Sequence, residues 1–186
     1  MLVIFFVPLL LSLTVWKPET VEAQSTRYDI ENSLQFNSAS SRYLSKNFWA
    51  VGSTTKWTLS AWVKRDSTGS DQTILEGSIN SSNLTLVYFS SDKVRFYHGS
   101  GGSTVADKAT TATYTDTSAW YHIVAAIDST QATAANRNRI YVNGVEISSF
   151  STDTNITQNA VTWIPDNNNN AGTNITHYVG RSTNGA

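Results

Sequence analysis

Two neighbouring stretches near the middle of the chain constrain its fold most strongly. Residues 120–128 read WYHIVAAID and are rich in β-branched and aromatic side chains. Such residues suit a pleated, partly buried strand, and the run is too short for a convincing helix. Residues 140–147 hold Asn143 and Gly144 between apolar residues, and this pair tolerates the positive φ angles of a two-residue type I′ turn. The two stretches predict a central strand followed by a tight β-hairpin.

The rest of the chain predicts more short strands separated by polar loops. Every second residue from Trp57 to Val63 is apolar, whereas the intervening positions are polar except for Trp62, so one face of this strand is expected to be buried. Further strands are predicted at residues 34–39, 41–44, 73–76, 84–89 and 94–97. Residues 98–119, 129–138 and 151–176 are polar and rich in small residues, and loops are predicted there. This pattern is typical of a β-sandwich.

At these stretches the sequence resembles the laminin-G-like branch of the concanavalin A-like lectin/glucanase superfamily. The matching segments, in chain order, are TLSAWVK at 58–64, WYHIVA at 120–125, IYVNGV at 140–145 and YVGR at 178–181. The resemblance extends from about Ser33 to the C-terminus and implies an all-β, two-sheet antiparallel jelly-roll sandwich. Members of this family bind glycans, bind proteins or build structure. The version without cysteine is similar to domains of phage tail proteins, other virion-surface proteins and secreted microbial adhesins.

Composition favours an extracellular or virion-surface protein. Charged residues make up 15% of the chain, whereas Ser (24), Thr (24) and Asn (16) supply most of its polarity. The net charge of -1 argues against nucleic-acid binding, which needs a basic surface. The chain has no cysteine, so neither a disulfide nor a thiolate metal site can form. A microbial or viral source is favoured.

The N-terminus begins with an apolar leader. Residues 2–11 are all apolar, about half the length that a membrane span needs, so no membrane span is predicted. Residues 1–23 are interpreted as a secretory signal peptide with small residues near Ala23. A retained apolar strand and a misplaced start codon are the alternatives. Residues 24–32 then form a polar extension, and residues 33–186 form the jelly-roll domain.

The resemblance also implies a C-terminal strand that this sequence does not supply. Relatives continue after a Gly-Arg pair such as Gly180-Arg181 with a strand that closes the sandwich, whereas this chain stops at Ala186. The domain is therefore expected to be incomplete at its C-terminus and to have an open groove. A neighbouring subunit that donated its N-terminal extension to this groove would generate a homo-oligomer or fibre. A truncated gene and an N-terminal segment that folds back onto its own domain are the alternatives.

Catalysis is not expected. Glucanases of this superfamily carry a Glu-x-Asp-x-x-Glu strand that brings two carboxylates together. Beyond the leader, this chain has only Glu31, Glu76 and Glu146, which are far apart in the sequence. The three histidines lack metal-ligand spacing, and His122 lies within a predicted strand. The expected function is structural or adhesive, with a lectin-like carbohydrate-binding module as the alternative.

A small number of residues are candidates for binding. Trp62 is the best candidate for stacking on a sugar ring, followed by Trp163 in the last long loop, with His122 as a further ligand-binding candidate. Calcium needs a cluster of oxygen ligands, and relatives bind it at a loop rim, so the candidates here are Asp153, Asp166 and Asn168. Glycosylation sequons begin at Asn80, Asn83, Asn155 and Asn174.

Overall fold

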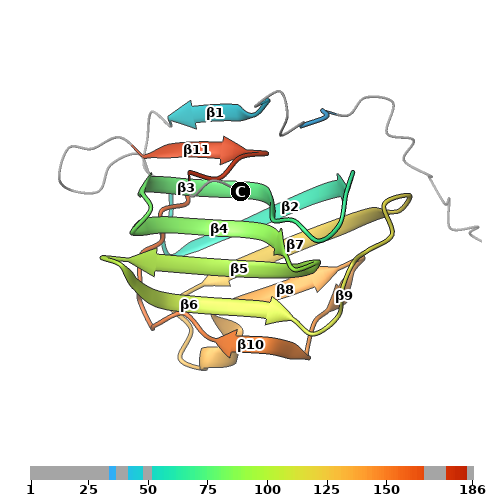
Figure 1. Cartoon of the computed structure of the whole chain (residues 1–186). Helices are drawn as coiled ribbons and strands as arrows, with labels where there is room; N and C mark the ends of the chain where they lie inside the picture. The colour runs from blue at the N-terminus through green and yellow to red at the C-terminus, as the bar shows by residue number, and fades with distance from the viewer. Residues whose placement is uncertain (1–33, 37–41, 48–51, 166–174, 184–186) are drawn as a thin grey trace, which may run out of the picture. The chain divides into compact units, whose positions relative to one another are not determined.

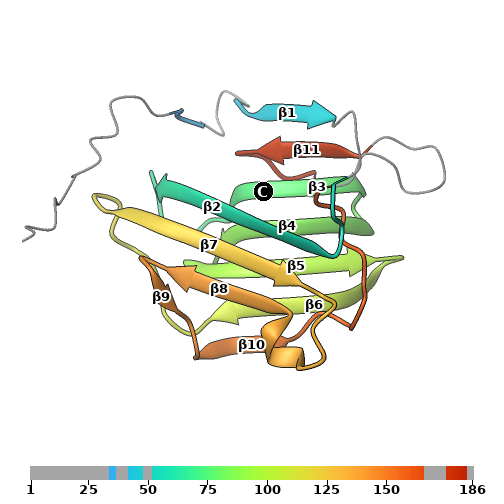
Figure 2. The same cartoon turned by 180° about the vertical axis from the view of Figure 1, so that it is seen from behind.

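Two antiparallel β-sheets face each other as a sandwich in the computed structural model, which describes residues 34–36, 42–47, 52–165 and 175–183 (Figures 1 and 2). The sandwich is formed by the unit Gln35–Ala186. The predicted all-β jelly-roll sandwich is confirmed. Across these described ranges, no helix has the length and apolar character needed to cross a lipid bilayer.

The larger sheet has seven strands among the described residues, in the order β1-β11-β3-β4-β5-β6-β10. Their bounds are β1 (Leu44–Asn47), β3 (Gln72–Asn80), β4 (Asn83–Ser90), β5 (Lys93–Ser100), β6 (Ser103–Thr110), β10 (Phe150–Thr154) and β11 (Thr176–Val179). The smaller sheet has four, β2 (Lys56–Lys64), β7 (Trp120–Asp128), β8 (Asn138–Val142) and β9 (Val145–Glu146), in the order β2-β7-β8-β9. A 3-10 turn, η2 (Ala134–Asn136), lies between β7 and β8.

Strand β7 is the central strand that the sequence predicts. It pairs with β2 along its whole length, from Lys56 opposite Asp128 to Lys64 opposite Trp120. Burial alternates along β7, and its inward residues are almost completely buried. The hairpin that follows is also confirmed, because Asn143 and Gly144 have φ angles of 52° and 80° between β8 and β9.

The core lies between the two sheets. Both sheets contribute β-branched and aromatic side chains at alternate positions, as the pleat of a strand requires. The buried residues of this core are Ile74, Val87, Phe89, Val94, Phe96, Ala106, Tyr121, Ile123, Ala125, Ile127, Ile140, Val142 and Ile156. Full burial of a large apolar side chain contributes about 1.5–3 kcal/mol. Apolar burial therefore holds the sandwich together in a chain that has no cysteine.

Two strands lie where the sequence predicted loops. Strand β6 falls within residues 98–119, and all of β10 except its first residue, Phe150, falls within residues 151–176. Their side chains are mostly small or polar, so the alternation of apolar residues that reveals a strand is absent. β6 is held between β5 and β10 by backbone pairing, and Lys108 of β6 forms an ion pair with Asp153 of β10 at 3.1 Å. Pairing with neighbouring strands decides their structure.

The first predicted strand is also placed differently. Residues 34–36 have no regular structure, although a strand was predicted over 34–39. β1 begins at Leu44, where the strand predicted over 41–44 was expected to end. The side chain of Phe36 packs against Gly180, where a Cβ would lie 2.3 Å from its Cγ atom. Residues 34–36 therefore contribute an aromatic contact and no backbone ladder.

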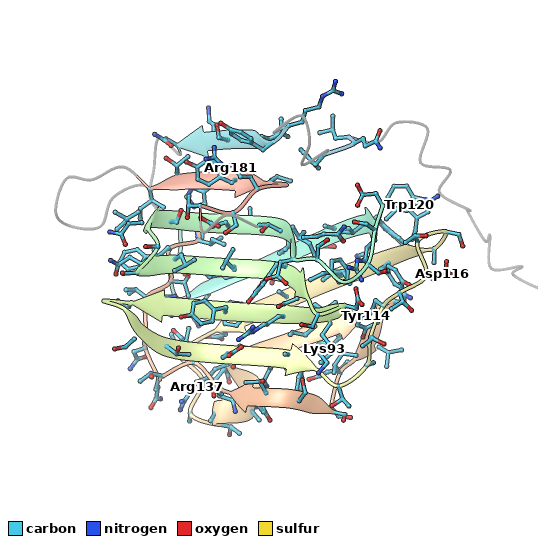
Figure 3. All side chains as sticks on the ribbon, viewed as in Figure 1. Lys93, Tyr114, Asp116, Trp120, Arg137 and Arg181 are labelled. Carbon is cyan, nitrogen blue, oxygen red and sulfur yellow. The ribbon has the colours of Figure 1, made fainter. Side chains whose placement is uncertain are left out.

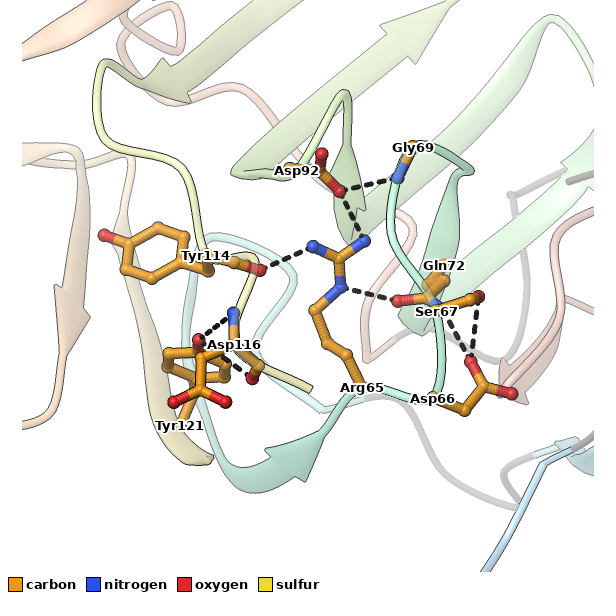
Figure 4. Close-up of polar contacts among 9 residues, drawn as sticks. All are labelled: Arg65, Asp66, Ser67, Gly69, Gln72, Asp92, Tyr114, Asp116 and Tyr121. Carbon is orange, nitrogen blue, oxygen red and sulfur yellow. Dashed lines mark hydrogen bonds and ion pairs between the residues drawn. The ribbon is translucent and has the colours of Figure 1, made fainter. Parts of the chain in front are cut away.

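The guanidinium of Arg65 ties three loops together at the end of β2 (Figure 4). Its Nε donates to Gln72 Oε1 at 2.7 Å, its Nη1 to the carbonyl of Tyr114 at 2.6 Å, and its Nη2 pairs with Asp92 Oδ1 at 2.8 Å. The same guanidinium lies 4.6 Å from the centre of the Phe89 ring. A buried cation needs partners for its charge, and each of the three guanidinium nitrogens of Arg65 has a polar partner, which for Nη2 is the Asp92 carboxylate. Three connections are thereby fixed around one side chain.

Candidate functional site

Among the residues that the structure describes, the most exposed aromatic side chain of the sandwich lies on the outer face of the smaller sheet. Trp62 is 57% exposed, and its ring stacks on that of His122, with centroids 5.0 Å apart and an interplanar angle of 24°. An exposed indole ring offers a large apolar surface on which a ligand can pack. The predicted outward position of Trp62 is confirmed, and His122 is its immediate neighbour.

The strand register explains this stack. Trp62 and His122 are directly opposite each other on β2 and β7. The backbone of His122 bonds to the hairpin instead of β2: Asn143 N donates to its carbonyl at 2.8 Å, and its N–H donates to Asn143 Oδ1 at 2.9 Å. The pair therefore occupies a non-hydrogen-bonded position, where facing side chains come closest. Ser60 Oγ lies 2.9 Å from His122 Nε2 and fixes the imidazole from the other side.

A shallow hollow lies further along the same face. It has a volume of about 370 Å³ and is lined by Lys56, Trp57, Thr58, Ala126, Ile127, Asp128, Asn136 and Arg139. Thr58 and Ala126 face each other across β2 and β7, and Arg139 is opposite Ala126 on β8. The small side chains of Thr58 and Ala126 leave room between the charged side chains of the hollow. The sequence did not predict this hollow, because it depends on the register of three strands and on η2.

The aspartate in the hollow is already satisfied by its own loop. Asp128 Oδ1 accepts hydrogen bonds from the N–H and hydroxyl of Thr130, and Oδ2 accepts one from Gln131 Nε2 at 2.7 Å. The hydrogen bonds from Thr130 and Gln131 lower the pKa of Asp128 to about 2. Lys56 Nζ lies 3.7 Å from the same carboxylate. Asp128 is therefore ionised and positioned as a fixed part of the wall.

Trp163 is half-buried and engaged with the larger sheet. Its indole Nε1 donates to the carbonyl of Gly99 at 2.9 Å, and its backbone N–H donates to Thr85 Oγ1 at 2.9 Å. Its backbone carbonyl lies over Gly77, where a Cβ would be 2.3 Å away. These contacts account for its polar atoms, so Trp163 anchors its loop and Trp62 is the better placed of the two tryptophans for a ligand.

His98 lies beneath the Trp163 loop and is almost fully buried. Its Nδ1 is 3.0 Å from Thr85 Oγ1. Burial lowers the pKa of His98 from 6.5 to about 4, although hydrogen bonds to the backbone of Leu84 and Val161 oppose part of this shift. The neutral imidazole is consequently the form that the folded protein holds near neutral pH.

Aromatic side chains pack the loop that precedes β7. Trp120 starts β7 at the same end as Tyr114 and Asp116 (Figure 3). The hydroxyl of Tyr121 donates to the carbonyl of Asp116 at 3.1 Å, and the rings of Tyr114 and Tyr121 meet edge to face at 5.4 Å. Aromatic packing thus orders this loop, and Trp120 is half-buried there.

Of the three predicted calcium ligands, the structure describes only Asp153. Asp153 pairs with the ammonium of Lys108, whose side chain is 4% exposed. Asp153 is thus already paired with a cation, and the calcium site stays a prediction. Asp166 and Asn168 lie outside the described residues. In the part of the chain that the structure describes, no group of three or more His, Cys, Asp or Glu side chains could hold a metal ion.

The sequons differ in accessibility. Asn80 is exposed at the end of β3, whereas Asn83 and Asn155 are half-buried. The side chain of Asn83 is engaged at both ends, because Nδ2 donates to Asn80 Oδ1 at 3.2 Å and Oδ1 accepts from Gly101 N at 2.9 Å. Asn80 is therefore the best placed of these three for a sugar. Asn174 lies outside the described residues.

Strand β2 has one open edge. Within the described ranges it pairs only with β7. The backbone N–H and C=O groups of successive residues in a strand point to alternate sides. Those of His122 bond on the β8 side, so the backbone groups of the odd-numbered residues of β7 bond to β2. The backbone groups that point to the open side of β2 are those of Thr58, Ser60, Trp62 and Lys64. The inward residues Trp57, Leu59, Ala61 and Val63 also remain only half-buried.

The two described glutamates of the domain are far from forming a catalytic pair. Glu76 is buried on β3, where its carboxylate accepts hydrogen bonds from the N–H and hydroxyl of Thr183. Glu146 is exposed on β9 in the other sheet. A retaining or inverting glycosidase needs both carboxyl groups beside one scissile bond. Glu31 lies outside the described residues.

With this geometry, the chain is a lectin-like or adhesion-type β-sandwich. A family model described as the concanavalin A-like lectin/glucanases superfamily, of the laminin G type, matches residues 32–181, and the chain belongs to this family. Domains of this type are generally carbohydrate-binding or structural and are typically extracellular. No curated protein and no solved structure matches the chain.

Proposed function

We propose that this protein is a non-catalytic adhesion domain that binds glycans on the outer face of its smaller sheet. The observation that carries the proposal is the Trp62–His122 stack, in which a 57% exposed indole ring is fixed by an imidazole behind it. A ring held in one orientation loses little conformational entropy when a sugar ring packs against it. Polar groups for hydroxyls are close by, on Ser60 and Lys64 of the same strand face.

The setting supports an extracellular role. The chain is rich in Ser, Thr and Asn and poor in charged residues. Its relatives are typically extracellular, and we extend this location, at a cell or virion surface, to the present chain. Glu76 and Glu146 lie on opposite sheets, which favours binding over catalysis.

A glycan array tests the proposal directly. The folded wild-type protein is expected to bind a subset of glycans, and Trp62→Ala should abolish binding while the far-UV spectrum stays unchanged. Leu44→Ala is the matched control, because Leu44 is a 50% exposed apolar residue on the other sheet. Unchanged binding by Trp62→Ala would rule out Trp62 as the binding site. The absence of any bound glycan would rule out the proposed function.

A second candidate function is that of a fibre subunit assembled by strand exchange. The open edge of β2 favours it, because unpaired backbone groups and half-buried apolar residues are what an added strand would cover. The donor would be the N-terminal extension of a neighbouring subunit, residues 24–32, or the apolar residues 2–11 if these are retained. A head-to-tail contact of this kind propagates unless it closes into a ring.

Light scattering and negative-stain microscopy test assembly. The full chain is expected to form large oligomers, and Thr58→Pro should prevent them, because proline removes a backbone donor on the open side of β2 and leaves its pairing with β7 intact. Thr58→Val keeps that donor and is the control. Monomers of the full wild-type chain would rule out the strand-exchange candidate and leave glycan binding untouched.

A further inference from the structure

The hollow on the outer face of the smaller sheet presents two cations to the solvent. Lys56 lies on β2 and Arg139 on β8, and their side chains are 57% and 43% exposed. The floor between them is formed by Thr58 and Ala126, which are too small to fill it. Its volume, about 370 Å³, is within the range of small-molecule sites.

The acidic groups nearby do not use up these cations. Asp128 accepts its hydrogen bonds from Thr130 and Gln131, and Lys56 is only at ion-pair distance, 3.7 Å. Arg139 Nη1 lies 3.9 Å from Glu146 Oε2, and both side chains are largely exposed, which makes the pair weak. Lysine has three donors and arginine five. Most of these donors are available to an incoming anion.

The hollow and the Trp62 ring belong to one surface. Lys56, Thr58, Ser60 and Trp62 are successive outward residues of β2, so along this strand the hollow extends from about 13 Å (Thr58) to about 20 Å (Lys56) from Trp62. Thr58 and Ser60 provide hydroxyl groups along the way. An extended oligosaccharide that stacks on Trp62 can therefore follow β2 to the hollow.

We infer that the hollow is a subsite for an anionic group of an acidic glycan, either a uronic acid carboxylate or a sulfate ester. The inference rests on the proposed glycan-binding function and names its ligand class. Arg139 offers a planar fork that matches two oxygens of either group, and Lys56 adds a point charge. Asn136 lines the wall of the hollow, and the negative charge of Asp128 opposes an anion there, which the two cations must outweigh.

A glycan array that contains neutral, uronate and sulfated members provides the test. Wild-type protein should bind acidic glycans more tightly than their neutral analogues, and binding should weaken as salt concentration rises. Lys56→Gln and Arg139→Gln should each weaken acidic glycans by about tenfold, the loss of one charge-assisted hydrogen bond, and leave neutral analogues unchanged. Lys46→Gln, an exposed lysine on β1, is the control with the same charge change.

Chemical derivatives of the strongest binder then identify the anion. Loss of binding after carboxyl reduction assigns a uronate, and loss after desulfation assigns a sulfate ester. Equal binding of acidic and neutral glycans, or acidic binding that survives the Lys56→Gln/Arg139→Gln double variant, would overturn the inference. If Trp62→Ala still abolished glycan binding, the proposed glycan-binding function would be retained and only the anion subsite would be rejected. An array with no bound glycan overturns both.

Discussion

Trp62 and His122 face each other at a non-hydrogen-bonded position between β2 and β7, and their rings stack at 5.0 Å. The orientation of His122 depends in turn on the hairpin, since Asn143 binds both its N–H and its carbonyl. The turn residue that made the fold recognisable in the sequence thus also helps to position the Trp62–His122 pair.

The first prediction concerns Asn143, whose φ angle is 52°. Asn143→Ala should destabilise the protein by about 1–2 kcal/mol, because alanine is strained in the left-handed region and the bond to His122 is lost. Asn143→Gly removes the same hydrogen bond without the strain and should cost less. Urea denaturation measures both variants, and an alanine variant as stable as the glycine variant would contradict the assignment of strain.

The second prediction concerns Arg65, whose side chain is 0% exposed. Arg65→Met should lower the free energy of unfolding by about 3 kcal/mol or more, because Asp92, Gln72 and the Tyr114 carbonyl lose their shared donor. Arg65→Lys keeps the charge but not the fork and should recover only part of the loss. Thermal denaturation gives the comparison, in which a lysine variant equal to wild type would show that the three-way geometry is unimportant.

The third prediction is a pH dependence of stability from His98. The pKa of His98 is about 4 in the folded protein and 6.5 in the unfolded chain. Between these two pH values, only the unfolded chain takes up the proton. The contribution of neutral His98 to stability is therefore fully present above pH 6.5. The free energy of unfolding should fall by about 3 kcal/mol as the pH drops to 4. Denaturation curves at pH 7, 5.5 and 4 measure this loss. A His98→Gln variant should lack this part of the slope, and equal slopes in both proteins would refute the prediction.

The fourth prediction concerns Gly77, over which the Trp163 carbonyl lies. Gly77→Ala places a Cβ 2.3 Å from that oxygen and should cost about 1–3 kcal/mol, since either the loop or β3 must move. Gly102→Ala is a useful comparison, because its φ is 78° but a Cβ there meets no atom within 4 Å. Its cost should be near 1 kcal/mol, from backbone strain alone. A Gly77→Ala variant with wild-type stability would show that the loop is free to shift.

Local patterns allowed much of the fold to be predicted. The alternation along β2 gave the outward position of Trp62, and Asn143-Gly144 gave the hairpin, because both signals depend on neighbouring residues in the sequence. β6 and β10 escaped prediction because side chains such as Ala106 and Ser151 carry little apolar signal. Their formation depends on pairing with strands that are already in place.

The candidate site was only partly predictable for the same reason. Trp62 could be chosen from its strand face, but its contact with His122 needs the register between residues sixty positions apart in the chain. Trp163 was the second candidate because it lies in a predicted loop, yet its indole N–H donates to the carbonyl of Gly99. Lys56 and Arg139 have no sequence motif in common, and only the folded sheet brings them to one hollow.

Radical footprinting of Trp62 is the most direct test of the central claim. Hydroxyl-radical oxidation followed by mass spectrometry should label the exposed indole strongly in the free protein and several-fold less when a bound glycan covers it. Oxidation of the half-buried Trp163 should stay the same in both states. Undiminished oxidation of Trp62 in the presence of a saturating, tightly bound glycan would contradict binding on this face.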